Sequence, residues 1–291
     1  MADPCALAVD VGGTKLAAAV VDRAGDVVRS ARVPTPSGDA EAVFSAVASL
    51  VAEVSDASEV VCGVGCGGPM TFGGEEVSPL NIAAWRGFPL RSRLASLTGR
   101  PVFVDNDAKA LALGEGWRGA ARGVGDYVAM VVSTGVGGGI VLGGRLLDGA
   151  AGNAGHIGHV IVVPDGRRCA CGALGCLEAE ASGTAILAVT GRPPAEAGPD
   201  VVARTGTLVG RAAASVANLL DLRLAVVAGS VALGFGAPFF TAAQVELDRS
   251  ARLSFSEGAR IVPAGLGAQG PLVGAAAVGW LGLGDPLAPG R

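Results

Sequence analysis

Residues Gly152–Glu178 read GNAGHIGHVIVVPDGRRCACGALGCLE, and they carry the most specific pattern in the chain. Both histidines of the protein lie here, together with three of its six cysteines. Imidazole and thiolate are the ligands that zinc prefers, and a structural zinc ion takes four of them in a tetrahedron. A turn at 164–166 folds the chain back, so that the histidine ten residues upstream of the first cysteine can meet the thiolates. The predicted zinc ligands are His159, Cys169, Cys171 and Cys176.

The alternative for this stretch is a group of buried or disulfide-bonded cysteines with a histidine in the core. Only one residue separates Cys169 from Cys171, which is too close for an easy disulfide. The other cysteines, Cys5, Cys62 and Cys66, lie in apolar runs typical of strands, and we interpret them as reduced core residues. In a protein with reduced thiols such a cluster is more often a metal site, which favours zinc.

Length and composition describe a globular chain that is large enough for two lobes. Of the 291 residues, 50% are apolar and 16% are charged, which suffices for sizeable cores and argues against disorder. The net charge of −4 and the pI of about 5.3 exclude a basic nucleic-acid-binding surface. No apolar run has the length of a membrane span, and the N-terminus has no secretory signal. We therefore expect a cytoplasmic protein that binds neither nucleic acid nor membranes.

Two glycine-rich turns, each between apolar strands, divide the chain into similar halves. The first turn joins the predicted strands Ala6–Val11 and Leu16–Val21, and the second joins Tyr127–Ser133 and Ile140–Leu142. Both patterns are typical of β-hairpins. We interpret the pair as the mark of an internal duplication with weak sequence identity.

Hydrophobic periodicity and local stop signals predict the remaining elements. Asp39 is a candidate helix cap, Gly99 a helix stop and Pro271 a plausible first helical residue. Helices are expected at 39–54, 90–98, 107–115, 207–220, 238–250 and 271–281, and strands at 27–33, 60–64, 101–104, 224–227 and 260–263.

Five motifs follow one another along almost the whole chain. They are Asp10–Lys15, Asn106–Asp107, Ser133–Gly139, Gly155–His159 and Cys169–Glu178. Together they resemble the ROK family of sugar kinases, in the sugar kinase–Hsp70–actin superfamily. The resemblance implies an actin-like α/β fold with two lobes hinged over a cleft for sugar and ATP. It implies a small N-terminal lobe at 1–118 and a larger lobe with the zinc motif at 119–291, whose last helix, about 271–284, leans back to the first lobe.

The same resemblance implies that the two glycine turns hold the β- and γ-phosphates of ATP. Backbone N–H groups can approach phosphate oxygens closely where no Cβ intrudes. Asp10 would hold Mg²⁺ through water, and Gly229 with Ser230 would meet the adenosine end. Either turn taken alone is equally well explained as an ordinary tight hairpin. The implied phosphate contacts are Gly12, Gly13, Thr14, Lys15, Thr134, Gly135, Gly137 and Gly138.

The sugar hydroxyl must lose a proton as it attacks phosphorus, and a carboxylate within reach can accept it. Asp107 is the candidate base because it follows a predicted strand, where ligands gather in α/β folds; the alternative is a helix N-cap. Asn106 both donates and accepts hydrogen bonds and suits a sugar hydroxyl. By resemblance the zinc is structural and fixes the loop that carries sugar contacts. The resemblance adds Gly68, Asn81, His159 and Glu178 to these contacts, with a turn glycine and a loop asparagine as alternatives for the first two.

His156 stands where many glucokinases of the family carry a glutamate. A carboxylate only accepts hydrogen bonds, whereas a neutral imidazole can donate one to an acyl carbonyl. The double histidine resembles the bacterial N-acetylmannosamine kinases of the family, and the segments 78–81 and 88–90 favour the same group. We therefore expect phosphorylation of N-acetylmannosamine or another N-acyl hexosamine at the 6-hydroxyl. Glucose is the alternative, followed by other hexoses, amino sugars and cyclitols.

Two further classes of protein share the resemblance. Sugar-responsive repressors of the family carry a helix-turn-helix before the kinase-like part, whereas only nine residues precede Asp10 here. A catalytically inactive sugar sensor would not need an intact Asp10, Asp107 and both glycine turns. The expected protein is thus an enzyme that uses ATP, Mg²⁺ and structural Zn²⁺. By resemblance it forms a homodimer or homotetramer.

Overall fold

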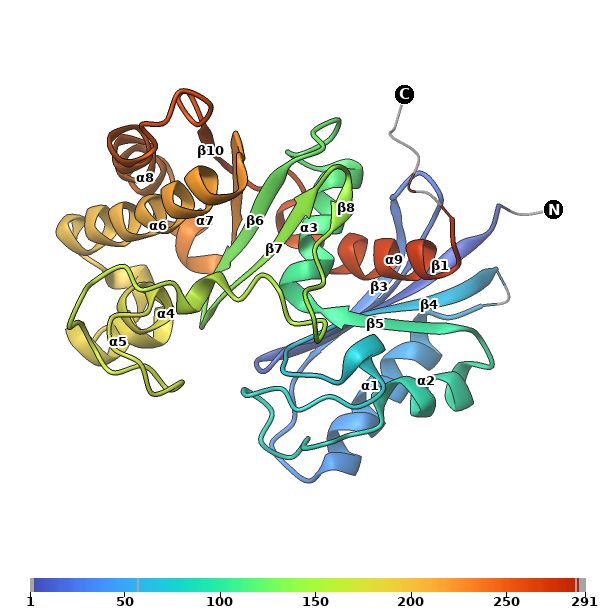
Figure 1. The fold of residues 1–291 in the computed structure, drawn as a ribbon. Coiled ribbons are helices and arrows are strands. Elements are labelled where there is room, and N and C mark those ends of the chain that lie inside the picture. The colour runs from blue at the N-terminus through green and yellow to red at the C-terminus, as the bar shows by residue number, and fades with distance from the viewer. Residues whose placement is uncertain (1–2, 57, 286, 288–291) are drawn as a thin grey trace. The chain divides into compact units, whose positions relative to one another are not determined.

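The computed structural model describes residues 3–56, 58–285 and 287 of the chain (Figure 1). The chain folds into two compact units, and each unit contains a five-stranded sheet with helices. Unit 1 contains the described residues of Met1–Gly123, Asp148–Ala154 and Gly265–Arg291, and unit 2 contains Val124–Leu147 and Gly155–Ala264. The polypeptide therefore leaves unit 1 after Gly123, returns for one short segment, and returns finally at Gly265.

The sheet of unit 1 brings two predicted site segments to one edge. Its strands are β1 (Cys5–Val11), β2 (Lys15–Val21), β3 (Val27–Pro34), β4 (Glu59–Cys66) and β5 (Val102–Asn106), in the spatial order β3-β2-β1-β4-β5. β1 to β3 form an antiparallel meander, whereas β4 and β5 run parallel to β1. Asp10 of β1 lies opposite Gly65 of β4, and Gly65 lies opposite Asp105 of β5. The carboxyl ends of the parallel strands thus meet where the sequence predicts chemistry.

Four α-helices pack on this sheet, with α1 and α2 on one face and α9 on the other (Figure 1). They are α1 (Ala40–Val54), α2 (Leu90–Thr98), α3 (Asp107–Arg118) and α9 (Gly270–Gly282), with the short 3₁₀ turns η1 (Phe72–Gly74) and η4 (Gly267–Gln269). Asp39 caps α1 as predicted, because its Oδ1 accepts from the Ala42 N–H at 2.8 Å. α9 lies directly on β4: a Cβ added to Gly63 would come within 1.9 Å of the Ala275 carbonyl oxygen. Only glycine permits this approach.

The sheet of unit 2 repeats the topology of the first. Its strands are β6 (Tyr127–Val132), β7 (Val136–Leu142), β8 (Arg145–Leu146), β9 (Leu224–Ala228) and β10 (Arg260–Pro263), in the order β10-β9-β6-β7-β8. β6, β7 and β8 form an antiparallel meander, and β9 and β10 run parallel to β6. β6 therefore takes the place that β1 takes in unit 1, which agrees with the predicted internal duplication.

The helices of unit 2 differ from the predicted ones at several ends. They are α4 (Leu177–Ala181), α5 (Gly183–Thr190), α6 (Pro199–Leu220), α7 (Ser230–Phe235) and α8 (Ala237–Ser250), with the 3₁₀ turns η2 (Ile157–His159) and η3 (Pro194–Glu196). The helix predicted at 207–220 is only the second part of α6, which begins with Pro199 in its first turn. Ser230, predicted in a loop, begins α7. Among the described residues, no helix is both long enough and apolar enough to cross a membrane.

Glu115 is a fully buried carboxylate in α3 that holds the segments where the chain leaves and re-enters unit 1. Its Oε2 accepts from the N–H of Ala120 at 2.7 Å and of Gly265 at 2.9 Å, and its Oε1 accepts from the Leu266 N–H at 3.1 Å. Gly119 leaves room for this carboxylate, since an added Cβ would lie 2.0 Å from Oε2. Three N–H donors compensate the burial of the charge.

Replacing Glu115 by alanine is expected to lower the free energy of unfolding by about 3 kcal/mol or more. Three backbone N–H groups would lose their acceptor, and each buried unpaired group costs about 1–3 kcal/mol. Urea unfolding followed by circular dichroism measures the change. Glu115→Gln keeps one acceptor oxygen and should lose less. A loss below about 1 kcal/mol for the alanine variant would contradict this role for Glu115.

Candidate active site and metal centre

The glycine turn of unit 1 is a closed hairpin held from the end of β3. The Gly12 N–H donates to the Lys15 carbonyl at 3.1 Å. The Thr35 hydroxyl donates to the Gly12 carbonyl at 2.7 Å, and its N–H donates to the Thr14 carbonyl at 3.0 Å. Gly13, Thr14 and Lys15 are exposed, as a phosphate-binding turn requires. Thr35 was not predicted, because the sequence marks it only as the residue after a strand.

Asp10 is buried at the carboxyl end of β1, with 6% of its surface exposed. Burial, and then the charge of Asp107, raise the pKa of the Asp10 carboxyl from 3.8 to about 7, against the opposing charge of Lys15. The folded state therefore binds this proton more tightly than the unfolded chain does. The resulting stabilisation is present at acidic pH and is lost as the pH rises from about 4 to about 7. Asp10 and Asp107 thus lie close enough to interact electrostatically.

Asn106 and Asp107 begin α3 and share one backbone donor. The Ala108 N–H lies 3.0 Å from Asn106 Oδ1 and 2.8 Å from Asp107 Oδ1. Asn106 is the N-cap of the helix, whereas Asp107 lies in its first turn and is exposed. The helix N-terminus favours a carboxylate at this position. Gly68 lies beside this pair, since an added Cβ would be 3.4 Å from Asn106 Nδ2.

Asn81 connects the predicted sugar and phosphate segments of unit 1. The neighbouring Leu80 N–H donates to the Gly68 carbonyl at 3.2 Å. A Cβ added to Gly13 would lie only 2.4 Å from the Asn81 Cβ, so Asn81 also packs against the glycine turn. Arg86 holds this loop through hydrogen bonds from Nη1 to the carbonyls of residues 79, 82 and 85. Sequence reasoning missed Arg86, because its partners are backbone atoms.

The glycine turn of unit 2 is held by the start of α5. The Ser133 N–H donates to the Gly135 carbonyl at 2.9 Å and closes the turn. The Gly183 N–H donates to the Ser133 carbonyl at 2.7 Å, and the Thr184 hydroxyl donates to the Thr134 carbonyl at 2.9 Å. Neither Gly183 nor Thr184 was predicted, since the sequence analysis missed α5.

Three predicted nucleotide contacts in unit 2, Gly137, Gly138 and Ser230, lie in a different local structure from the expected one, whereas Gly229 lies in the predicted loop. Gly137 and Gly138 extend strand β7 instead of forming the turn, because β6 supplies ladder partners for both. Gly229 has a φ of +101°, and a Cβ there would lie 2.2 Å from the Val132 carbonyl oxygen, so the position requires glycine. The Ser230 hydroxyl lies 2.9 Å from the Ser133 hydroxyl. Gly229 and Ser230 are therefore next to the glycine turn of this unit.

The predicted sugar contacts of unit 2 surround the end of the same hairpin. His156 and His159 have ring centroids 6.1 Å apart, and His156 is exposed. Glu178, at the start of α4, accepts the Val136 N–H through Oε2 at 2.9 Å. Glu178 therefore positions the first residue of β7 in addition to any contact with a sugar.

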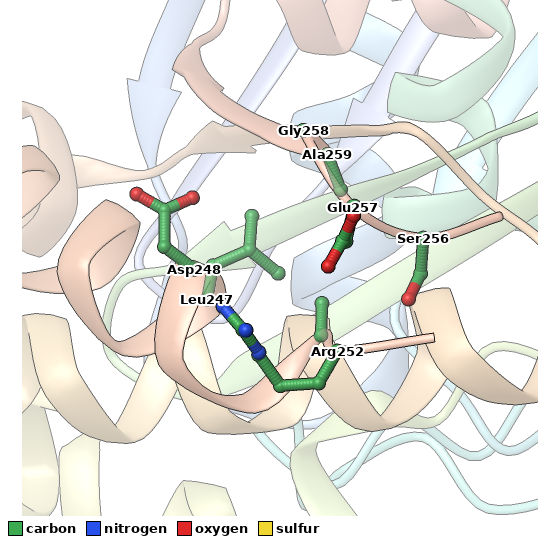
Figure 2. A pocket seen from close by; sticks show the side chains of 8 residues that line it. Leu247, Asp248, Arg252, Ser256, Glu257, Gly258 and Ala259 are labelled. Carbon is green, nitrogen blue, oxygen red and sulfur yellow. The ribbon is translucent and has the colours of Figure 1, made fainter. Parts of the chain in front are cut away.

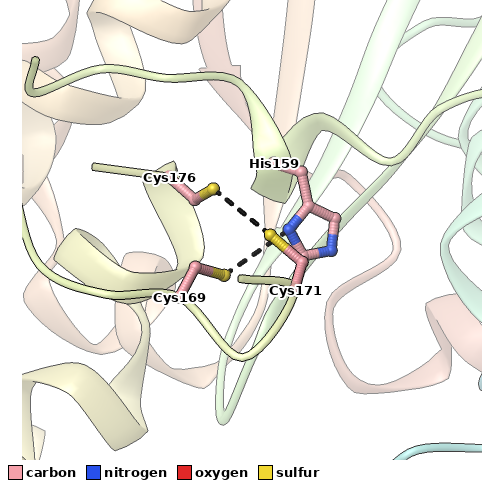
Figure 3. Close-up of side chains that lie close together, drawn as sticks. All are labelled: His159, Cys169, Cys171 and Cys176. Carbon is pink, nitrogen blue, oxygen red and sulfur yellow. Dashed lines mark hydrogen bonds between the residues drawn. The ribbon is translucent and has the colours of Figure 1, made fainter. Parts of the chain in front are cut away.

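His159, Cys169, Cys171 and Cys176 form a compact cluster in unit 2, as Figure 3 shows. Their four ligand atoms lie within 4.8 Å of one another. Cys169 Sγ is 3.7 Å from His159 Nδ1, and Cys171 Sγ is 3.7 Å from Cys176 Sγ. Two sulfur atoms bound to one zinc ion at about 2.3 Å in a tetrahedron lie about 3.8 Å apart. The donor set and its spacing therefore fit zinc.

The ring of His159 presents Nδ1 to the sulfur atoms of the cluster, and its Nε2 points away from them (Figure 3). Burial, followed by the neighbouring Cys171 and Cys169, raises the pKa of the Cys176 thiol to about 12. A metal ion must therefore displace a proton from Cys176. Hydrogen bonds from the backbone at Ala173 lower the pKa of the exposed Cys171 thiol.

Glu180 fixes the base of the cysteine loop. Its buried carboxylate accepts from the Arg167 N–H at 2.6 Å, and pairs with Arg167 Nη1 at 2.7 Å and Arg204 Nη2 at 2.5 Å. Hydrogen bonds from these groups hold the pKa of Glu180 below its usual value despite its burial. Arg204 lies on α6, so the network anchors the cysteine loop to the core of unit 2.

A cavity of about 250 Å³ lies elsewhere in unit 2, at the C-terminal end of α8 (Figure 2). Its lining includes Asp248, Arg252 and Glu257, so both signs of charge face it. None of the predicted site residues lines this cavity. It is therefore separate from the candidate site.

Two sequence comparisons identify relatives of this chain. The profile of the ROK family matches residues 6–279. A glucokinase of Streptomyces coelicolor is 40% identical over 182 residues, which are 62% of this chain and 57% of the glucokinase. An N-acetylmannosamine kinase of Escherichia fergusonii is 36% identical over 246 residues, which are 79% of this chain and 84% of that kinase. The match thus spans little more than half the length of the glucokinase.

A solved structure carries the same fold. A ROK family glucokinase from Streptomyces griseus, in complex with glucose and AMPPNP, superposes with a TM-score of 0.83 at 32% identity. The superposition covers 95% of this chain and 99% of the other. The predicted actin-like α/β fold class is therefore confirmed.

Proposed function

This chain belongs to the ROK family, and from that premise we propose that it is a sugar kinase that transfers the γ-phosphoryl group of ATP to the 6-hydroxyl of a hexose. The position of Asp107 carries the proposal. This carboxylate is exposed in the first turn of α3, beside Asn106 and within electrostatic reach of Asp10. The kinases among the relatives support the same class of reaction.

Unit 1 supplies the proton acceptor and the charge for this reaction. Phosphoryl transfer needs positioning and charge stabilisation rather than covalent help from the protein. Asp107 accepts the proton of the 6-hydroxyl as it attacks, and Asn106 orients the sugar through its amide. Asp10 would hold Mg²⁺, which neutralises phosphate charge when bound. Because the pKa of the Asp10 carboxyl is about 7, part of the protein carries its proton at neutral pH, and a bound cation would displace it.

Unit 2 supplies phosphate and sugar contacts. Thr134 and Gly135 of the glycine turn present backbone N–H groups to phosphate oxygens. His156, His159 and Glu178 contact the sugar ring, and the cysteine cluster holds their loop in place through a structural zinc ion. The orientation of His159 supports both roles for this residue, as a zinc ligand and as a sugar contact. Its Nδ1 faces the sulfur atoms, and its Nε2 faces away from them (Figure 3).

N-acetylmannosamine, or another N-acyl hexosamine, is the proposed substrate, with glucose as the second candidate. Of the two sequence relatives described above, the one that covers more of this chain is named for N-acetylmannosamine. The other, and the solved glucokinase structure that covers 95% of this chain, are named for glucose, which is why glucose stays the second candidate. The exposed imidazole of His156, close to His159, can donate a hydrogen bond to an acyl carbonyl. A carboxylate at the same position cannot donate.

A coupled ADP-release assay with ATP and Mg²⁺ tests the function and the specificity together. We expect turnover with N-acetylmannosamine to exceed turnover with glucose, N-acetylglucosamine, mannose and glucosamine. His156→Glu should lower the ratio of kcat/KM for N-acetylmannosamine to that for glucose by roughly 10- to 100-fold, because one donor is lost and one carboxylate is introduced. A wild-type preference for glucose would contradict the assignment of His156, and no turnover with any of the five sugars would contradict the kinase.

A further inference from the structure

The loop 78–87 of unit 1 is closed at its base by hydrogen bonds. Val77 and Phe88, which flank it, are both buried and exchange two backbone N–H···O bonds, at 2.9 and 3.0 Å. Just inside this pair, the Gly87 N–H donates to the Ser78 hydroxyl oxygen at 2.9 Å. Compact surface loops whose ends meet in this way are Ω-loops, which are frequently functional.

Both arms of this loop are fixed within unit 1. The side chain of Trp85 is fully buried and stacks on Phe88, with ring centroids 4.2 Å apart and ring planes 2° from parallel. Its Nε1 donates to the Ala40 carbonyl, at the start of α1, at 3.1 Å. On the other arm, the Ser78 N–H donates to the Pro69 carbonyl at 2.8 Å. The position of the tip between these arms, at 80–84, therefore depends on the contacts of the tip itself.

The tip carries Asn81 to the glycine turn of the same unit. A Cβ added to Gly13 would lie 2.4 Å from the Asn81 Cβ and 3.0 Å from the Asn81 carbonyl oxygen, so the loop and the turn are in contact. The Leu80 N–H donates to the Gly68 carbonyl at 3.2 Å. Within 80–84 only Ile82 is buried, so the core holds the tip at a single residue.

Arg86 provides the polar support of this tip. Its Nη1 lies 3.0 Å from the Pro79 carbonyl oxygen, 3.0 Å from that of Ile82 and 2.6 Å from that of Trp85. The first two carbonyls also accept the N–H groups of Ile82 and Trp85, each at 3.1 Å, and so close two successive short turns. One guanidinium thus joins backbone groups from before, within and after the tip.

Pairing of the carbonyls alone does not explain this arginine. Arg86 is exposed, and carbonyls near the surface can bind water instead of a side chain. What the arginine adds is a defined geometry, because its guanidinium is planar and always charged. Hydrogen bonds from a charged donor are also about twice as strong as those between neutral groups. These properties suit a residue that holds the backbone of the tip in one place.

We propose that Arg86 is a positioning residue for the sugar, which holds the tip of the loop 78–87 so that Asn81 stays against Gly13. The inference rests on the proposed function, with Asn81 among the sugar contacts and Gly13 among the phosphate contacts. Arg86 acts through Asn81 and sets the place of this sugar contact relative to the glycine turn, all within unit 1. The turn itself does not depend on Arg86, because Thr35 binds it from the end of β3.

Arg86→Met is the principal test, because it keeps an apolar stem but removes the hydrogen bonds to all three carbonyls. We expect hydrogen exchange at the Leu80 and Ile82 amides to become roughly tenfold faster or more. The KM for the sugar should rise roughly fivefold or more, whereas kcat and the KM for ATP should each change by less than about twofold. Arg86→Lys, whose ammonium also donates to carbonyls, should restore part of the sugar KM.

The double variant of Arg86→Met with Asn81→Ala tests whether Arg86 acts through Asn81. Asn81→Ala alone should raise the sugar KM, and the addition of Arg86→Met should raise it further by less than about twofold, because both substitutions remove one sugar contact. If the two increases multiplied instead, Arg86 would act on the sugar independently of Asn81, and the proposal would be wrong.

Arg91→Met is the matched control for the loss of a cation near this loop. Arg91 is also an arginine of unit 1, but it pairs with Glu75, outside the loop, at 2.6 Å. Its replacement should leave the exchange at Leu80 and Ile82 and the sugar KM unchanged. Equal effects in Arg91→Met, unchanged exchange in Arg86→Met, or faster exchange with an unchanged sugar KM would each overturn the proposal.

Hydrogen exchange needs no turnover, so the role of Arg86 and the proposed function can fail separately. Unchanged exchange in Arg86→Met of an active kinase would contradict the role of Arg86 alone. If Arg86→Met showed faster exchange but the wild-type protein phosphorylated none of the sugars, the result would contradict the kinase and not the support of the loop by Arg86.

Discussion

An Asp107→Asn variant is expected to bind the sugar within several-fold of the wild-type affinity but to turn over roughly 10²–10⁴ times more slowly. The amide has the size of the carboxylate, and its oxygen can still accept the Ala108 N–H at the start of α3. It cannot take a proton from the 6-hydroxyl. Calorimetric titration with sugar, together with kcat from the ADP-release assay, separates binding from chemistry.

Asn106→Ala is the matched control for this experiment. It removes the neighbouring side chain and the helix cap, since Asn106 Oδ1 also accepts the Ala108 N–H, but it leaves the proposed base in place. Its main effect should be a higher KM and a lower free energy of unfolding, by about 1 kcal/mol for the cap. If Asp107→Asn kept more than a tenth of the wild-type turnover, Asp107 would not be the base.

The fold was predictable from the sequence where local signals and strand periodicity agree. The hairpin from Cys5 to Val21 was found because its two apolar strands flank one glycine turn. α2 was found to the residue because Gly99 adopts φ +67° directly after it. α5 was missed because its residues carry no clear apolar stripe, and β7 was shortened because Gly137–Gly139 look like a turn. Pairing with β6, which is not local, keeps those glycines in the strand.

The candidate site was predictable in its motifs but not in the contacts that hold them. Asp107 and the cysteine cluster carry signals in their residue types and spacing. Thr35, Lys109 and Glu180 carry none, because each acts through atoms of segments that are distant in the sequence or through backbone groups. The structure also pairs Asp105 with Lys109 at 3.0 Å, a contact that no motif of the sequence marks. Such partners follow from the tertiary fold, which local patterns do not encode.

The wild-type chain is expected to bind one zinc ion, and a Cys171→Ser variant is expected to bind none and to lose much of its stability. Cys171 is the exposed member of the cluster, so the substitution removes a ligand with little change of packing. Structural zinc binds zinc-finger peptides with about 10–16 kcal/mol, whereas whole domains are stable by only about 5–15 kcal/mol. Even part of the zinc energy therefore matters for unit 2. Metal analysis by mass spectrometry and thermal unfolding measure both effects.

Cys5→Ser is the matched control, because Cys5 lies in β1 of unit 1 and takes no part in the cluster. It should retain one zinc ion per chain.

The loss of stability in Cys171→Ser should be confined to the cysteine loop at first. Hydrogen exchange should become faster at 160–178, where the backbone pairs of Ile161 with Cys176 and of Arg168 with Leu174 close the loop. It should rise less on α6, which Glu180 joins to the loop through Arg204. The decisive sample is wild-type protein from cells grown with added zinc and purified without chelators. If it contained no metal, the cluster would not be a zinc site. If hydrogen exchange became faster throughout both units, the ion would stabilise more than this loop, and the ion pair of Glu180 with Arg204 would not limit the effect to it.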